Sequence, residues 1–122
     1  MNLWEQFERC RPWLEKALKY AYGTHTIEDI AAGLAGGQYI LWPGHHSAVL
    51  FEIVQFPRKR IAFVFLAGGS LQEIEQMIPA MEAWARSIGC DRAEFSGRAG
   101  WTRSFLSKAG YQQRNVAMTK EL

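Results

Sequence analysis

The sequence is poor in cysteine and in net charge, and it has no long apolar run. Its two cysteines, Cys10 and Cys90, match no metal-ligand spacing and cannot form a dense disulfide framework. The net charge of +2 disfavours a nucleic-acid-binding protein, for which a clearly basic domain is expected. No uncharged stretch approaches the ~18 apolar residues of a membrane span, and the N-terminal residues do not read as a secretory signal. We therefore expect a soluble, cytoplasmic protein without a metal site.

The composition is that of an ordinary globular protein. Hydrophobic residues make up 48% of the chain, charged residues 21% and aromatic residues 13%, close to typical usage. A length of 122 residues suits one core. We expect a single domain over residues 1–122.

Hydrophobic periodicity predicts two helices and then three strands in the first half of the chain. An amphipathic helix covers residues 2–21, and Pro12 inside it is expected to kink or split it. Thr26 and Asp29 have capping-box spacing and begin a second helix. Runs rich in β-branched and aromatic residues then predict an antiparallel meander. Its three strands are expected at residues 39–42, 48–56 and 61–66.

The second half predicts a helix, a strand, a short helix and a last strand. Ser70 and Glu73 form a second capping box in front of a long apolar-periodic segment that contains Pro79. The remaining elements are expected at residues 92–96, 101–109 and 111–120. The fold class is therefore α+β, with the order α-α-β-β-β-α-β-α-β. The third and fourth strands should be parallel, and helices should cover both faces of a mixed sheet.

Residues 105–111 read F-L-S-K-A-G-Y, a short helix that ends at Gly110 before an aromatic residue opens the last strand. This segment is similar to the L-Y-E-K-L-G-F segment of the GNAT N-acetyltransferase superfamily. The order of elements also resembles that of a GNAT fold whose first strand is missing. The chain further resembles small, diverged GNAT-like proteins of phage and prophage genomes, which implies the host cytoplasm as its location.

The resemblance implies acetyl-CoA as cofactor, with its pyrophosphate bound by main-chain N–H groups at a helix N-terminus. The candidate turn comprises Leu66, Ala67, Gly68, Gly69, Ser70 and Leu71. It lacks the Arg or Gln that begins the family motif. Ser70 and Glu73 can cap the helix and so occupy amides that a phosphate needs, while Glu73 and Glu75 add negative charge. A capped structural turn is the favoured interpretation, and a pyrophosphate site is the alternative.

Two further positions bear on catalysis. Leu106 stands where many family members carry the Tyr that protonates the departing thiolate, and leucine cannot donate a proton. Glu52 is the only ionisable side chain between Ser47 and Arg58, and strand alternation places it on an apolar face. An unpaired acid there has a raised pKa and is a candidate general base, with a structural role as the alternative. Glu94 is a weaker candidate.

Three other segments favour structural interpretations. His45 and His46 are adjacent in a turn and point to opposite sides, which makes joint zinc ligation awkward. Residues 57–60, P-R-K-R, predict a charged hairpin tip. Residues 97–101, G-R-A-G-W, predict a tight turn with a Trp anchor.

Two functions follow. The first is a diverged GNAT-like protein with a weakened or lost acetyl-CoA site, which acts by binding a protein partner as a phage or prophage accessory protein. The second is an active acetyl-CoA-dependent N-acyltransferase. In it, Glu52 is the general base for a small amine, which attacks the thioester directly. Nucleic-acid binding through the basic hairpin is the least favoured of the three functions. The sequence does not decide whether the protein forms a homodimer.

Overall fold

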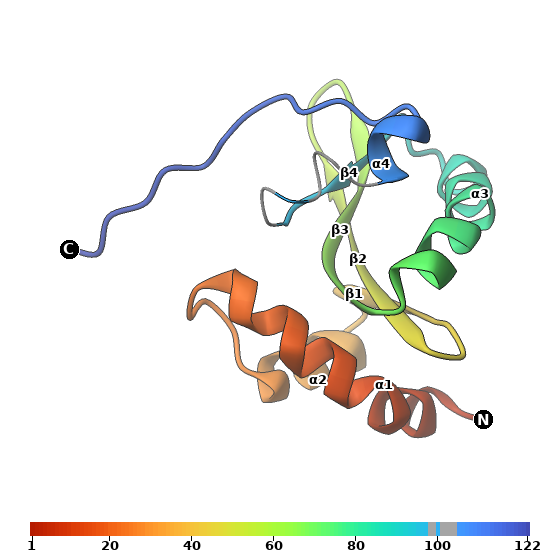
Figure 1. The fold of residues 1–122 in the computed structure, drawn as a ribbon, viewed down its shortest axis with the longest axis vertical. Helices are drawn as coiled ribbons and strands as arrows, with labels where there is room; N and C mark the ends of the chain where they lie inside the picture. The colour runs from red at the N-terminus through yellow and green to blue at the C-terminus, as the bar shows by residue number, and fades with distance from the viewer. Residues whose placement is uncertain (98–99, 101–104) are drawn as a thin grey trace.

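The protein has three layers, with one sheet between two groups of helices. The computed structural model describes residues 1–97, 100 and 105–122. Figure 1 shows α1 and α2 on one side of the sheet, and α3 and α4 on the other. This arrangement confirms the predicted α+β class with helices on both faces. Within the described residues, no helix is long and apolar enough to cross a membrane.

The first helices begin at side-chain caps. In α1 (Leu3–Leu18), the Asn2 side chain accepts the Glu5 N–H at 2.9 Å. The helix continues through Pro12 without being split and is followed by a 3₁₀ turn, η1 (Lys19–Ala21). The capping box predicted for α2 (Ile27–Ala35) is confirmed, because Thr26 accepts the Asp29 N–H and Asp29 accepts the Thr26 N–H.

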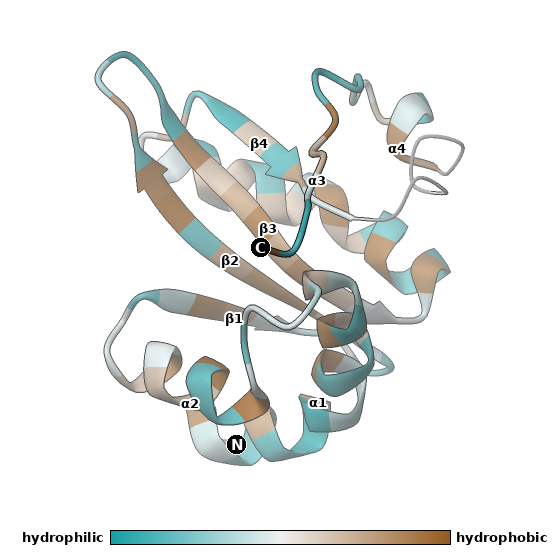
Figure 2. Ribbon diagram, turned by 90° about the vertical axis from the view of Figure 1, so that its left-hand side faces the viewer, coloured by the Kyte–Doolittle hydropathy of each residue, from teal (hydrophilic) through white to brown (hydrophobic). Residues whose placement is uncertain are grey.

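The sheet has four strands in the order β1-β2-β3-β4. They are β1 (Tyr39–Pro43), β2 (Ser47–Gln55), β3 (Arg60–Gly69) and β4 (Arg92–Phe95). The first three form the predicted antiparallel meander, and β4 runs parallel to β3 as the crossover through α3 requires. Figure 2 shows β2 and β3 as largely hydrophobic, with a hydrophilic hairpin tip between them, as predicted.

A β-bulge lies in the middle of β3. Leu50 pairs with Leu66, but its neighbour Phe51 pairs with Val64, so Phe65 is an extra residue in the ladder. A bulge places two successive side chains on the same side of a sheet. Accordingly, Phe65 and Leu66 both pack against the α1/α2 layer.

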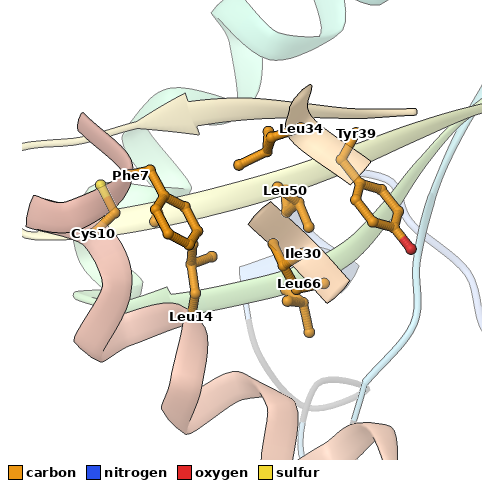
Figure 3. Close-up of a cluster of buried hydrophobic side chains, with 9 residues drawn as sticks. Phe7, Cys10, Leu14, Ile30, Leu34, Tyr39, Leu50 and Leu66 are labelled. Atoms are coloured by element: carbon orange, nitrogen blue, oxygen red, sulfur yellow. The ribbon is translucent and has the colours of Figure 1, made fainter. Parts of the chain in front are cut away.

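Each face of the sheet has its own apolar core. The core under α1 and α2 is drawn in Figure 3, where side chains from both helices meet those of β2 and β3. The buried members of this first core are Phe7, Cys10, Leu14, Ile30, Leu34, Tyr39, Ala48, Leu50 and Leu66. The second core lies under α3 and α4, and its buried members are Val49, Phe51, Ala62, Val64, Ile74, Ile78, Met81, Ala85 and Leu106.

The last predicted strand is wrong. The structure has α3 (Leu71–Ser87) and α4 (Phe105–Lys108), but residues 111–120 form neither helix nor strand. Tyr111 is tied down, because its hydroxyl donates to Glu82 at 2.8 Å and its ring contacts Phe95 edge-on. The exposed chain after it leaves the body of the protein (Figure 1). The presence of a strand depends on its packing and pairing with neighbours and not on local propensity alone.

The predictions at residues 97–101 and at the start of the short helix, residues 101–104, fall largely outside the described residues.

Candidate functional site

A hollow opens where β3 and β4 part. The two strands pair only over residues 61–64 of β3, with a last contact from the Ser96 N–H to the Val64 carbonyl at 3.3 Å. Beyond this point β3 continues for five residues, to Gly69. The C-terminal end of α1 and η1 form the opposite wall. The lining residues are Ala17, Tyr20, Ala21, Thr24, residues 64–67 and residues 95–97.

The size and wall of the hollow suit an extended small ligand. Its volume is about 240 Å³, slightly below the range of sites that enclose a drug-sized molecule. One wall is a strand edge, whose main-chain groups can bind an extended chain as a neighbouring strand would. The other wall combines the methyl groups of Ala17 and Ala21 with the hydroxyl-bearing side chains of Tyr20 and Thr24. The hollow therefore fits one arm of a larger molecule better than a whole nucleotide cofactor.

The turn that follows β3, the candidate pyrophosphate site, forms hydrogen bonds with the protein's own groups. The Ser70 side chain accepts the Glu73 N–H at 3.2 Å, and the Ser70 N–H donates to the His46 carbonyl at 2.9 Å. The predicted capping box is thus only half correct. The Glu73 carboxylate instead accepts the His46 N–H at 2.9 Å and the Ser47 hydroxyl. The β1–β2 turn therefore occupies groups that the reciprocal cap would have used.

The two glycines of this turn are required by packing within the protein. A Cβ at Gly68 would lie 2.5 Å from the Trp13 carbonyl oxygen, because the backbone of α1 passes directly over it. Gly69 has a φ of +94°, and a Cβ there would collide with the His46 carbonyl oxygen. Both positions thus bring segments of this chain into close contact, which accounts for the glycines without a ligand.

The β1–β2 turn is itself held over the start of α3. Arg9 on α1 donates to the Gly44 carbonyl at 2.8 Å and to the His45 carbonyl at 3.1 Å. Within the part of the chain that the structure describes, no group of three metal-ligand side chains forms around His45 and His46 or elsewhere. The main-chain N–H groups of Leu71 and Gln72 lie in the first turn of α3. Within the described residues, neither has a hydrogen-bond acceptor from the protein.

The charge at this helix start is negative. Hydrogen bonds from the Ser47 hydroxyl and then from the His46 N–H hold the pKa of Glu73 below its ordinary value of 4.5. The carboxylate is therefore ionised at neutral pH and repels an anion approaching the first turn, although it suits the helix dipole.

Glu73 should contribute stability that depends on pH. Because its pKa is lower in the folded protein, its contribution is present above about pH 4.5 and is lost as the pH falls further. We expect Glu73→Gln to lower the melting midpoint at pH 7 and to have a smaller effect at an acidic pH at which the native carboxyl is protonated. The pKa of Asp29 is also lowered, but its contribution to stability is the same in the native protein and in Glu73→Gln, so it cancels in the comparison. Thermal melts at the two pH values measure the difference, and a constant difference would contradict this role.

The candidate base Glu52 lies on the α1/α2 side of the sheet. It is half-buried on β2, where it pairs across the strands with Tyr39 and Phe63. Glu94 lies next to Phe63 on β4 and forms an ion pair with Arg92 at 3.4 Å. Neither acid is among the residues that line the hollow. The structure thus places Glu52 and the turn of residues 66–71 at different parts of the sheet.

Leu106 is a core residue. It is 6% exposed and packs in the second core. Burial and then the hydrogen bond to Glu82 raise the pKa of the nearby Tyr111. The Tyr111 hydroxyl therefore keeps its proton, which it donates in the hydrogen bond to Glu82. Neither side chain is placed to protonate a thiolate in the hollow.

A row of polar side chains behind the wall of the hollow could not be predicted from the sequence. The Thr24 hydroxyl lies 2.7 Å from Nδ1 of His25, and Nε2 of His25 lies 3.2 Å from the Tyr39 hydroxyl. Thr24 itself lines the hollow. Tyr39 is far from His25 in the sequence, and no periodicity links them. The pairing exists only because β1 and the α1–α2 connection meet.

Solved acetyltransferase structures share this arrangement of elements. A GNAT family acetyltransferase from Staphylococcus aureus matches all of this chain and 95% of its own, with 12% identity and a TM-score of 0.65. An acetyltransferase from Trypanosoma brucei matches 79% of this chain and 78% of its own, with 14% identity and a TM-score of 0.61. Glucosamine-6-phosphate N-acetyltransferase from Arabidopsis thaliana matches 81% and 80%, with 13% identity and a TM-score of 0.56.

The chain has a GNAT-like fold. No protein-family model and no curated protein matches the sequence. At such low identities the likeness concerns the fold, so the function has to be argued from the hollow and from the turn after β3.

Proposed function

We propose that this protein is a diverged GNAT-like protein whose acetyl-CoA site is weakened at the nucleotide end, and that it binds a small acyl thioester in the hollow between β3 and β4. The observation that carries the proposal is the bonding of the α3 N-terminus. Ser70 and Glu73 are engaged by the β1–β2 turn, and the ionised Glu73 repels a pyrophosphate. The hollow next to this turn stays open to a ligand that carries no phosphate.

The proposal is tested by comparing ligands with and without the nucleotide. Thermal melts would be run with acetyl-CoA, with free CoA and with S-acetyl-pantetheine, which keeps the thioester arm only. A ligand at 100 times its dissociation constant stabilises a fold by about 2.7 kcal/mol, which raises the midpoint of a domain of this size by roughly 10 °C. We expect S-acetyl-pantetheine to raise the midpoint at least as much as acetyl-CoA does at the same concentration.

A pair of variants locates the binding. Ala21 lines the hollow and Ala32 is exposed on α2, so Ala21→Leu should fill the hollow while Ala32→Leu should not. We expect the shift with S-acetyl-pantetheine to be lost in the first variant and kept in the second. A shift that survives Ala21→Leu would place the ligand elsewhere.

The alternative is an active acetyl-CoA-dependent N-acyltransferase with a small amine as acceptor. It is supported by the position of Glu52 on the α1/α2 side of the sheet, which also bears the wall of the hollow formed by Phe65 and Leu66. A shift with acetyl-CoA and none with S-acetyl-pantetheine would favour this alternative, because the nucleotide would then carry the affinity. No shift with any of them would leave binding of a protein partner as the function. The phage or prophage origin stays a prediction.

A further inference from the structure

A row of three side chains leads from the hollow to the sheet. Thr24 lines the hollow, and its hydroxyl lies 2.7 Å from Nδ1 of His25. Behind His25, the Tyr39 hydroxyl lies 3.2 Å from Nε2. Behind Tyr39, Glu52 is its direct partner across the strands. The order is therefore a hydroxyl at the ligand site, an imidazole and a phenol.

The imidazole in this row is held by packing as well as by hydrogen bonds. Its ring lies edge-on against Phe65, with ring centroids 4.7 Å apart, and against Tyr39 at 6.5 Å. Tyr39 is only 5% exposed, and its ring lies so close to Gly33 that a Cβ there would collide with it. Figure 3 shows the Tyr39 hydroxyl pointing away from the leucines of the first core. The partner of His25 is thus fixed by the core.

The protons of the row can all be placed in one direction. A neutral imidazole carries one proton, so one ring nitrogen donates and the other accepts. Burial and then the charge of Glu52 raise the pKa of Tyr39, which keeps its hydroxyl protonated. If Nε2 of His25 donates to the Tyr39 oxygen, Nδ1 carries no proton and can accept the one from Thr24.

We propose that Thr24 is a nucleophile that takes up an acyl group from a short acyl thioester in the hollow, with His25 as its base and Tyr39 as a positioning residue. A hydroxyl within hydrogen-bond reach of a base that a third group orients is the arrangement of nucleophilic catalysis. The inference rests on the proposed binding of a thioester in the hollow, and it goes further by assigning the acceptor atom.

The reaction step is an acyl transfer. Oγ1 of Thr24 attacks the carbonyl carbon of the thioester, and its proton passes to Nδ1 of His25. The C–S bond then breaks, and His25 returns the proton to the departing thiolate, which leaves O-acyl-Thr24 and a free thiol. The hollow is lined by β3 beyond its pairing with β4, and main-chain N–H groups on this open edge can donate to the carbonyl oxygen during the attack.

The experiment uses the full chain and S-acetyl-N-acetylcysteamine, a short thioester without a nucleotide. Mass spectrometry should find one added acetyl group, on the peptide that contains Thr24. Thr24→Ala should abolish this adduct, and Thr24→Ser, which keeps the hydroxyl, should retain it. His25→Gln should slow the reaction by about 100-fold, the usual contribution of a general base. Thr119→Ala removes an exposed hydroxyl in the tail and should change nothing.

A melt with the same thioester, run on each variant, separates folding and binding from acylation. Tyr39→Phe should slow acylation without changing the midpoint shift that the thioester causes, because the hydroxyl acts through His25 and not on the ligand. A midpoint shift in the native protein without an acetyl group on Thr24 overturns this inference and leaves the proposed binding intact. If the native protein shows neither a midpoint shift nor an acetyl group on Thr24, both this inference and the proposed binding are overturned. Equal acetylation of native protein and Thr24→Ala also overturns it.

Discussion

Replacing Leu50 with alanine is expected to lower the free energy of unfolding by about 2–5 kcal/mol, the cost of truncating a buried leucine that leaves a cavity. Leu50 has no exposed surface and lies in the first core, between β2 and the helices α1 and α2 (Figure 3). For a domain of this size the loss corresponds to a fall of roughly 8–20 °C in the melting midpoint. Differential scanning calorimetry measures both quantities.

Leu71→Ala is the matched control for this prediction. Leu71 is 47% exposed at the start of α3, and its truncation should change the stability by no more than about 0.5 kcal/mol. Equal effects of the two substitutions would mean that the layer of α1 and α2 does not pack on β2 as described.

Gly68→Ala is expected to destabilise the free protein by about 1–3 kcal/mol, because an added methyl group would meet backbone that cannot move away cheaply. The obstacle is the Trp13 carbonyl of α1, 2.5 Å from the position of the new Cβ. The melting midpoint should fall by roughly 4–12 °C. If this glycine served only to admit a cofactor, the substitution would reduce ligand affinity and leave the stability of the free protein unchanged.

Gly36→Ala separates this effect from the general cost of replacing a glycine. Gly36 ends α2 with a φ of −83°, and a Cβ there would meet only ordinary contacts, the nearest at 3.5 Å. Its midpoint should stay within a few degrees of that of the native protein. A fall as large as that of Gly68→Ala would contradict the close approach of α1.

The α+β class, the order of the first elements and the parallel β4 could be predicted from the sequence. They depend on hydrophobic periodicity and on caps such as Thr26 with Asp29, whose partners are three residues apart. The same reasoning failed where a partner lies far along the chain. Glu73 has the spacing of a reciprocal cap, yet its carboxylate binds His46, 27 residues away. The strand expected at residues 111–120 does not form, because a strand there depends on a partner strand elsewhere in the chain.

The candidate site was predictable only in part. The sequence drew attention to Glu52 and to the turn of residues 66–71, because an isolated acid and paired glycines are visible locally. Which groups meet them depends on the packing of α1 on the sheet and on the pairing of β1 with β2. That packing places Trp13 over Gly68 and Tyr39 against His25.

The sequence by itself thus determined where helices and strands form and which of their faces are buried, since those properties depend on side chains within a few residues of one another. The tertiary structure decided that the α3 N-terminus is bonded to the β1–β2 turn, that a hollow remains where β4 ends, and that Thr24, His25 and Tyr39 stand in one row. Each of these depends on contacts between segments far apart in the chain, and such contacts follow from how the layers pack rather than from periodicity.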